Sequence, residues 1–347
     1  MRSGVVAIPK WFHPNRRHLV APSLIDPNGV RGPTPGQTRG PRWRRSSHGF
    51  YVPAWVDSSL LEQRILEAGA ALPGHGGVTG WASLRWLGGT WFTGTRADGS
   101  ARPVTLAAID IRPQPGVVPS EERLNADEII VHDGLRITRA LRSALFEMRY
   151  ADSLWDAVVV ADMAAFSDLF AIDELWTYAL AHGGMTGIPQ ARDATGLADE
   201  NSWSPMETVM RLIWELVAEL PRPLCNQPVF DLQGRHIGTP DLLDVEAGLY
   251  GEYDSAYHLE GSRRLKDQVR EDAFRRVGLE PVVMIAGQSR YEVAERIMAA
   301  RARALRRANP RLWTIEQPLW WTPTETVAQR RAVSDLDRAR LLARRAA

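Results

Sequence analysis

Apolar residues recur at helical spacing through the first half of the chain, and short apolar runs lie between these repeats. Leu60, Leu61 and Ile65 begin one repeat, which is typical of a helix with one buried face. The pattern predicts helices over 60–72, 79–87, 138–148, 155–166 and 172–181, and strands over 104–111 and 128–131. Thr138 is the expected N-cap of the third helix. Residues 55–195 are therefore expected to form a mixed α/β domain, and the polar residues 186–203 a linker.

A more regular order of elements begins at Ser204. Ser204 is a favourable N-cap, Pro205 suits the first helical position, and Glu207 completes a capping box. The pattern then predicts strands over 227–230, 236–244 and 249–254, a helix over 263–277, a strand over 281–286 and a helix over 291–307. We expect an αβββαβ core within residues 204–310, followed by an Arg-rich C-terminal extension over residues 311–347.

The four-residue turn Val245–Gly248 joins two of these strands and sets their register if the hairpin is symmetric. Counting back from the turn pairs Asp244 with Leu249, Leu243 with Tyr250, Leu242 with Gly251 and Asp241 with Glu252.

Three acids converge in this register. Asp241 opposes Glu252, and Asp254 follows on the same face of its strand. Opposed carboxylates repel each other, and Mg²⁺ or Mn²⁺ held by their oxygens would offset the repulsion. The alternative is a slipped register, or a nearby Arg or Lys that neutralises the acids.

Composition limits the classes of protein to which the chain can belong. The chain has 347 residues, a net charge of +1 and one cysteine, so a disulfide within the chain is impossible. No run of 18 apolar residues is present, which predicts a cytoplasmic protein without a membrane span.

Positive charge is concentrated near the N-terminus, where residues 1–50 hold nine Lys and Arg and a single acid. Arg42, Arg44 and Arg45 precede a Gly turn and a short aromatic strand, as in the β-wing of a winged helix. We expect residues 1–54 to be a partly disordered winged-helix remnant that contacts DNA phosphates; a solvated basic hairpin is the alternative.

The C-terminal pattern resembles the PD-(D/E)XK nuclease superfamily, especially the very-short-patch-repair endonuclease-like domains of actinobacterial proteins. The match consists of Ser204-Pro205-x-Glu207, Pro240-Asp241, Glu252-Tyr253-Asp254, His258 and Lys266-Asp267-x-x-Arg270-x-x-Ala273. The strand Gly49-Phe50-Tyr51-Val52-Pro53 is similar to the one that ends AbiEi-antitoxin-type winged-helix segments.

The resemblance implies a restriction-endonuclease-like core and a metal-dependent phosphodiesterase site. Asp241 and Glu252 would bind the metal, which lowers the pKa of an attacking water. Glu207 would reach the site as a ligand or through water, or would serve only as the capping-box acid.

The Lys that usually follows the second acid is Asp254 in this chain. Asp254 would be a third metal ligand, His258 a general acid or base, or Lys266 the missing positive charge. The alternative for each of these three residues is a surface side chain without a role in the site.

Two functions follow. The first is a DNA endonuclease that acts in defence or repair. The second is a non-catalytic DNA-binding regulator of the antitoxin or repressor type. A protein partner, from a toxin–antitoxin pair or a second copy of the chain, is a weaker alternative.

Overall fold

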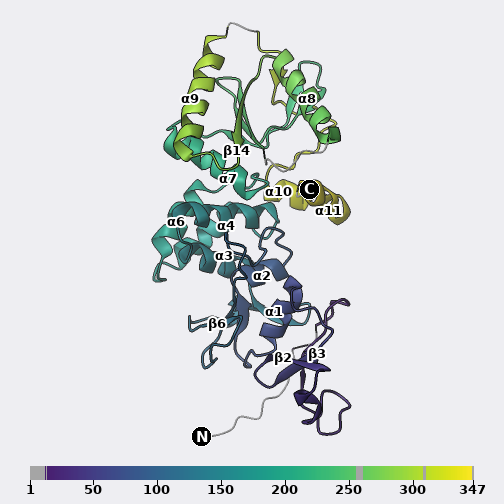
Figure 1. Ribbon diagram of the computed structural model, residues 1–347. Helices are drawn as coiled ribbons and strands as arrows, with labels where there is room; N and C mark the ends of the chain where they lie inside the picture. Colours follow the sequence, from purple (N-terminus) through teal and green to yellow (C-terminus); the bar gives the residue numbers. More distant parts are fainter. Residues whose placement is uncertain (1–11, 13, 255–260, 308–309, 346–347) are drawn as a thin grey trace. The chain divides into compact units, whose positions relative to one another are not determined.

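The computed structural model describes residues 12, 14–254, 261–307 and 310–345. The chain divides into two compact units, Met1–Tyr150 and Ala151–Ala347. Both contain helices and strands (Figure 1), so the described residues form a mixed α+β protein in which no sheet closes into a barrel.

The first unit contains two sheets. Its strands are β1 (Ser23–Leu24), β2 (Trp43–Ser47), β3 (Phe50–Pro53), β4 (Gly77–Thr79), β5 (Val104–Ala107), β6 (Val117–Ser120), β7 (Ile129–His132) and β8 (Leu135–Thr138). Its helices are α1 (Leu61–Gly69), α2 (Trp81–Trp86) and α3 (Ala140–Arg149), with single turns η1 (Gln37–Arg39) and η2 (Ala126–Glu128). The strand orders are β1-β3-β2 and β6-β5-β4-β8-β7.

The helices of the first unit follow the predicted apolar spacing, with one difference at α3. The expected N-cap, Thr138, is the last residue of β8, and Arg139 precedes the helix without a side-chain cap. The Thr138 hydroxyl is buried and bonds to the hydroxyls of Thr79 (2.8 Å) and Ser143 (2.6 Å). Pairing inside the sheet therefore outweighs the local capping preference of this residue.

The second unit holds the region of chemical interest. Its helices are α4 (Leu154–Phe166), α5 (Ile172–Ala181), α6 (Ile188–Leu197), α7 (Pro205–Leu212), α8 (Gly261–Arg276), α9 (Arg290–Arg306), α10 (Val327–Ala332) and α11 (Asp335–Arg345), and α7 continues into a wider turn, η3 (Ile213–Val217). Its strands are β9 (Leu224–Cys225), β10 (Val229–Asp231), β11 (His236–Gly238), β12 (Leu242–Asp244), β13 (Leu249–Asp254), β14 (Glu280–Ile285) and β15 (Trp313–Thr314).

Helix α6 lies in the stretch that was expected to be a linker. Gly187 precedes it in a left-handed conformation, and a proline occupies its first turn. Ala191 and Ala194 are fully buried. The linker prediction is wrong because the buried face of α6 consists largely of small side chains, which do not form a clear apolar repeat in the sequence.

The central sheet of the second unit has the order β14-β13-β12-β9. Its hairpin confirms the register counted from the sequence for three pairs: Asp244 with Leu249, Leu243 with Tyr250 and Leu242 with Gly251. Strands β13 and β14 are parallel, and α8 lies between them in the chain as the crossover. The helix, hairpin, helix, strand and helix follow in the predicted order.

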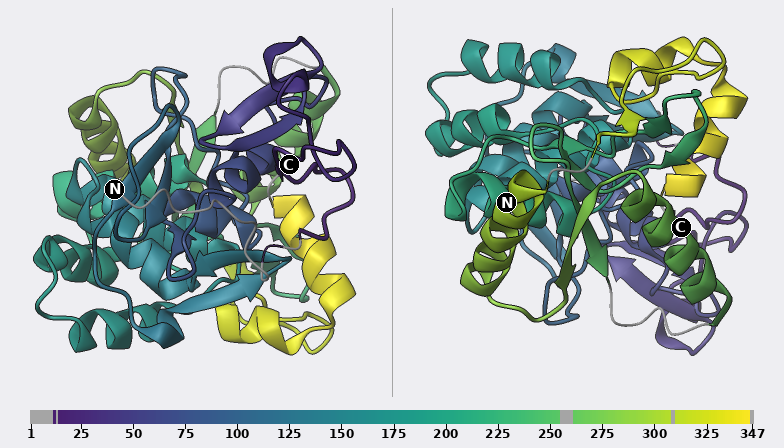
Figure 2. Two further views of the ribbon diagram at one scale, coloured as in Figure 1. Left: turned by 90° about the horizontal axis from the view of Figure 1, so that it is seen from below. Right: turned by 90° about the horizontal axis from the view of Figure 1, so that it is seen from above.

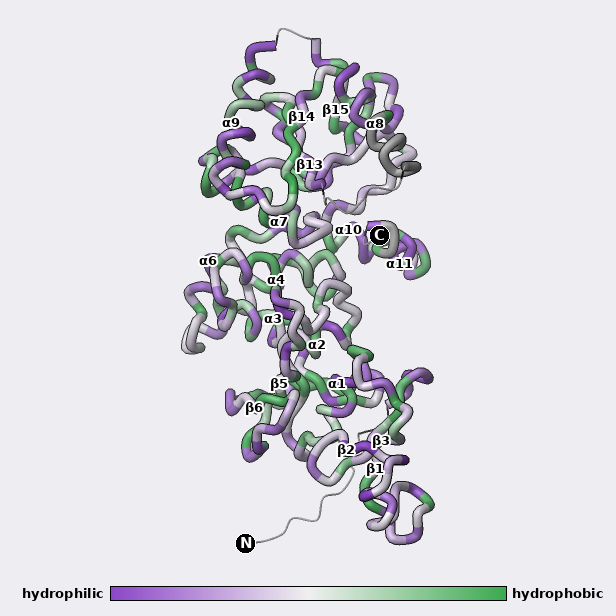
Figure 3. The backbone as a smooth tube through the Cα atoms, viewed as in Figure 1, coloured by the Kyte–Doolittle hydropathy of each residue, from purple (hydrophilic) through white to green (hydrophobic). Residues whose placement is uncertain are grey.

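Each face of this sheet packs against different helices. Leu242, Leu249 and Met284 belong to a core with α7 and α9, whereas Leu243 and Tyr250 pack with Phe274 of α8. Figures 1 and 2 show α9 and α8 on opposite sides of β13 and β14. In Figure 3 most of β14 is coloured hydrophobic, as expected of a strand that is covered on both faces.

The strand predicted over residues 236–244 is broken into β11 and β12. Pro240 lies in the break and cannot donate a ladder hydrogen bond. Strand β11 instead pairs with β10, in a separate small sheet completed by β15. The break leaves Asp241 just before β12, outside the regular ladder.

The residues of the expected C-terminal extension pack onto the second unit. Arg330 of α10 is fully buried, and its guanidinium bonds to Asp168 (2.6 Å) and to the carbonyl of Ala165 (2.8 Å). Within the described residues, no helix combines the length and the apolar character needed to cross a membrane.

Candidate acidic site

Helix α7 begins with the predicted Ser204 N-cap but without the predicted capping box, and it buries its first acid. The Ser204 hydroxyl accepts a hydrogen bond from the Glu207 amide (3.2 Å). The Glu207 carboxylate accepts from the Trp203 amide (2.7 Å), one residue before the position that a capping box would use. Only 8% of Glu207 is exposed.

Asn226 connects this acid to the sheet. Its side-chain amide donates to Glu207 Oε2 (2.6 Å) and to the Asn201 carbonyl (2.7 Å). Its backbone amide donates to the carbonyl of Asp241 (2.9 Å). Asn226 has a φ of 44°, a conformation that Asn tolerates better than most residues. The turn after β9 thus holds Glu207 against the segment that carries Asp241.

Asp241 is held by the opposite strand. Its Oδ2 accepts from the backbone amide of Tyr253 (2.7 Å), and the residue is half-buried. Gly251 leaves room for a side chain of α7: a Cβ there would lie 2.8 Å from Met210 Cε. The break at Pro240 leaves Asp241 outside the ladder, on the segment that Asn226 joins to Glu207.

The two carboxylates influence each other's ionisation. Burial, then repulsion from Asp241, raises the pKa of Glu207 to about 8. Burial raises the pKa of Asp241 to about 6, against the Tyr253 hydrogen bond and the positive charge of Arg270. Two neighbouring acids whose pKa values are both raised are typical of a functional site.

Glu252 forms an ion pair with Arg270, which was not among the predicted site residues. Arg270 Nη2 lies 3.1 Å from Glu252 Oε2, and the same guanidinium lowers the pKa of Asp241. Arg270 lies one helical turn after Lys266 in the motif Lys266-Asp267-x-x-Arg270. Since residues four apart share a helix face, that spacing was a signal that could have identified it.

The remaining predicted residues are not all brought together. Asp254 is exposed at the end of β13. His258 lies outside the described residues, and so does the side chain of Lys266, whose backbone belongs to α8. Among the residues that the structure describes, no three His, Cys, Asp or Glu side chains form a group that could hold a metal ion. The three-acid ligand set of Asp241, Glu252 and Asp254 stays a prediction.

The pair Glu207 and Asp241 nevertheless suits a hard divalent cation. Mg²⁺ is often bound by one or two carboxylates, with waters and substrate phosphates completing its shell. Each carboxylate uses one oxygen for the hydrogen bonds above. The other oxygens, Oε1 and Oδ1, make no hydrogen bond to the described residues. One oxygen on each acid is thus available to a ligand.

The predicted basic hairpin is present in the first unit as β2 and β3, and its arginines differ. Arg44 makes a two-bonded ion pair with Glu67 (2.8 and 2.9 Å). Arg42 and Arg45 are exposed, and Arg45 also bonds to His48 (2.8 Å). In the described residues before β2 the only helical element is the single turn η1, so the two helices of a winged helix are not seen there.

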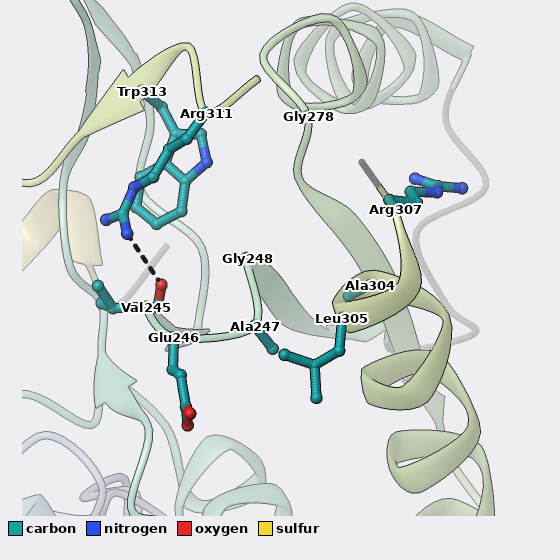
Figure 4. A pocket seen from close by; sticks show the side chains of 10 residues that line it. All are labelled: Val245, Glu246, Ala247, Gly248, Gly278, Ala304, Leu305, Arg307, Arg311 and Trp313. Carbon is teal, nitrogen blue, oxygen red and sulfur yellow. Dashed lines mark hydrogen bonds between the residues drawn. The ribbon is translucent and has the colours of Figure 1, made fainter. Parts of the chain in front are cut away.

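A small cavity of about 190 Å³ lies at the other end of the hairpin, around the β12–β13 turn (Figure 4). Arg311 stacks on Trp313 at 3.8 Å and donates to the carbonyl of Val245 (3.2 Å). None of the predicted site residues lines this cavity.

The structure adds Asn226 and Arg270 to the acids read from the sequence. Asn226 had no sequence signal, because its role depends on the contact between the β9 turn and α7. Comparison with known proteins assigns no relationship: no family model, no curated protein and no solved structure matches the chain.

Proposed function

We propose that the second unit is a divalent-metal-dependent endonuclease-like domain that acts on DNA. The observation that carries the proposal is the meeting of Glu207, which is buried, and Asp241, which is half-buried; both have raised pKa values and one open oxygen. The order of elements and the Pro-Asp and Glu-x-Asp motifs support the PD-(D/E)XK resemblance. Arg42 and Arg45, whose side chains are exposed, would contribute phosphate contacts.

The chain's own residues would divide the work. Glu207 and Asp241 would hold Mg²⁺ or Mn²⁺, and Asn226 and the Tyr253 amide would fix the two carboxylates in place. The bound metal would supply Lewis acidity and an activated water. Arg270 would hold Glu252 and place positive charge beside the acids, where the superfamily's usual Lys is replaced by Asp254.

A metal-dependent thermal shift tests the acid pair. Mg²⁺ or Mn²⁺ at about 100 times its Kd should stabilise the protein by about 2.7 kcal/mol, equivalent to about 5–10 °C for a unit of this size. Asp241→Asn and Glu207→Gln should abolish the shift. Asp272→Asn, an exposed acid on α8, is the matched control and should retain it. An equal shift in Asp241→Asn would remove the acid pair from the metal site.

Plasmid cleavage with the same proteins tests catalysis. Wild type should nick supercoiled DNA only with a divalent metal, and Asp241→Asn should not. Asp254→Asn tests whether a third acid binds the metal. Activity that survives in this variant indicates a site of two acids, and activity that is lost indicates that Asp254 is also a ligand.

A DNA-binding regulator without catalysis is the second candidate. The ion pair of Arg270 with Glu252 favours it, because the cation occupies an acid that a nuclease would use for metal. DNA binding that persists without cleavage under every metal condition would select this function over the first.

A further inference from the structure

Arg345, at the end of α11, contacts Trp203, the residue that precedes the N-cap of α7. Its guanidinium lies over the indole of Trp203, 4.4 Å from the ring centroid. The backbone amide of Trp203 is the group that donates to Glu207 Oε2. The negative charges of Glu325 and Asp168, and more weakly that of Glu207, act on Arg345 through space.

The hydrogen bonds of Arg345 are incomplete. Its Nη2 donates to the carbonyl and hydroxyl of Thr324 (3.2 and 2.8 Å). Nε and Nη1 are both buried and have no hydrogen-bond partner among the described residues. Buried polar groups are normally bonded, and a buried cation is normally paired with an anion. Arg345 is bonded only through Nη2, and no carboxylate of the described residues forms an ion pair with it.

Arg330 provides the contrast within the same segment. It also bonds to the Thr324 carbonyl, but its charge is balanced by Asp168 at 2.6 Å. The two guanidiniums share one acceptor, so their charges repel. Burial, then repulsion from Arg330, lowers the pKa of Arg345 to about 10. An anion would offset both the repulsion and the missing hydrogen bonds.

We propose that Arg345 is the phosphate-binding cation of the acidic site, with its guanidinium held flat by Trp203 and its Nε and Nη1 directed to a phosphate group. The planar guanidinium suits phosphate, and stacking on an aromatic ring fixes its orientation. The identification of that phosphate as one in a nucleic-acid backbone rests on the proposed function. The anion site itself depends only on Arg345 and its surroundings.

The test uses the full chain and inorganic phosphate, at constant ionic strength and without metal. Phosphate should raise the melting temperature of wild type. Arg345→Gln should weaken phosphate binding by about 10- to 100-fold, as expected for lost hydrogen bonds to a charged group. Arg340→Gln, an exposed arginine of α11, is the matched control and should bind phosphate like wild type.

Arg345→Lys separates a binding role from a folding role. Lysine keeps the charge but loses the planar stack, so binding should be intermediate while circular dichroism matches wild type. Equal phosphate binding by wild type and Arg345→Gln would overturn the inference.

The same proteins are then heated with Mg²⁺. If Mg²⁺ still raises the melting temperature of Arg345→Gln while phosphate binding is lost, both proposals are supported. Phosphate binding that depends on Arg345 in a protein without any metal shift overturns the proposed function and supports the anion site.

Discussion

Two buried ionisable side chains of α7, Arg211 and Glu207, lie one helical turn apart and have different charged neighbours. Arg211 is fully buried and pairs with Asp162 at 2.7 Å, with neither side chain exposed. Glu207 is nearly as buried, but its charged neighbour is another acid, Asp241. The first arrangement balances its charges and connects α7 to α4. The second brings two acids together, and neither has an ion pair among the described residues.

The surroundings of Asp162 show why the balanced site is structural. Its carboxylate also accepts from the Thr208 hydroxyl (2.8 Å) and the Asp199 amide (2.7 Å). Arg211 donates further to Glu215 (2.9 Å). Helices α4 and α7, the wider turn η3 and the loop at Asp199 are thereby joined through one ion-pair network. Among the described residues no cation forms an ion pair with Glu207, whose hydrogen bonds come from neutral amides.

The largest expected effect is the loss of the balanced pair. Arg211→Met leaves Asp162 buried without its cation and should reduce the free energy of unfolding by about 3–5 kcal/mol. Arg235→Met, which breaks an 80%-exposed arginine's pair with Asp231, is the control and should change it by less than about 1 kcal/mol. Urea denaturation measures both. Equal effects would show that burial of the pair does not matter.

A smaller and pH-dependent effect is expected at the unbalanced pair. The pKa of Glu207 rises from 4.5 to about 8 on folding, so the folded state binds its proton more tightly. Stability from this group is fully present below pH 4.5 and is lost as the pH rises towards about 8. The slope in that window is at most about 1.4 kcal/mol per pH unit.

Glu207→Gln keeps acceptors for Trp203 and Asn226 but cannot ionise. The variant should therefore lose less stability than wild type between those pH values, as measured by urea denaturation across the range. Asp272→Asn should follow the wild-type slope. Parallel curves for wild type and Glu207→Gln would mean that Glu207 ionises as it does in the unfolded chain.

The sequence predicted the elements that depend on local pattern. The Ser204 cap, the hairpin register and the order of elements after it follow from capping, turn length and apolar spacing. The α6 helix was missed because its buried face is made of small residues such as Ala191 and Ala194. The break at Pro240 could have been inferred, since proline is rarely tolerated inside a strand.

The candidate site was predicted less completely, for a physical reason. Counting along the hairpin, which is a local operation, predicted that Asp241 opposes Glu252, but the observed ladder ends at Leu242 and Gly251. Asn226 and Arg345 reach the same region through contacts between segments far apart in the chain, and no periodicity encodes such contacts. Arg270 was predictable only in part: its helix follows from the apolar spacing, but its pairing with Glu252 depends on how α8 lies against the sheet.

The smallest expected effect extends the comparison to the basic hairpin. Arg44 is balanced by Glu67, whereas Arg42 is exposed. If the hairpin contacts DNA, Arg42→Gln should weaken binding and reduce the slope of log affinity against log salt by about 1, as for one lost phosphate contact.

Arg44→Gln should leave that slope unchanged, because a guanidinium already bonded twice to a carboxylate contributes little to a phosphate. Its effect should instead be a loss of about 1 kcal/mol or less in unfolding free energy. Fluorescence anisotropy of a labelled duplex, titrated at several salt concentrations, distinguishes the two arginines. Equal salt slopes for both variants would mean that the Glu67 pair opens on binding, and the distinction between balanced and unbalanced charge would then not hold for this hairpin.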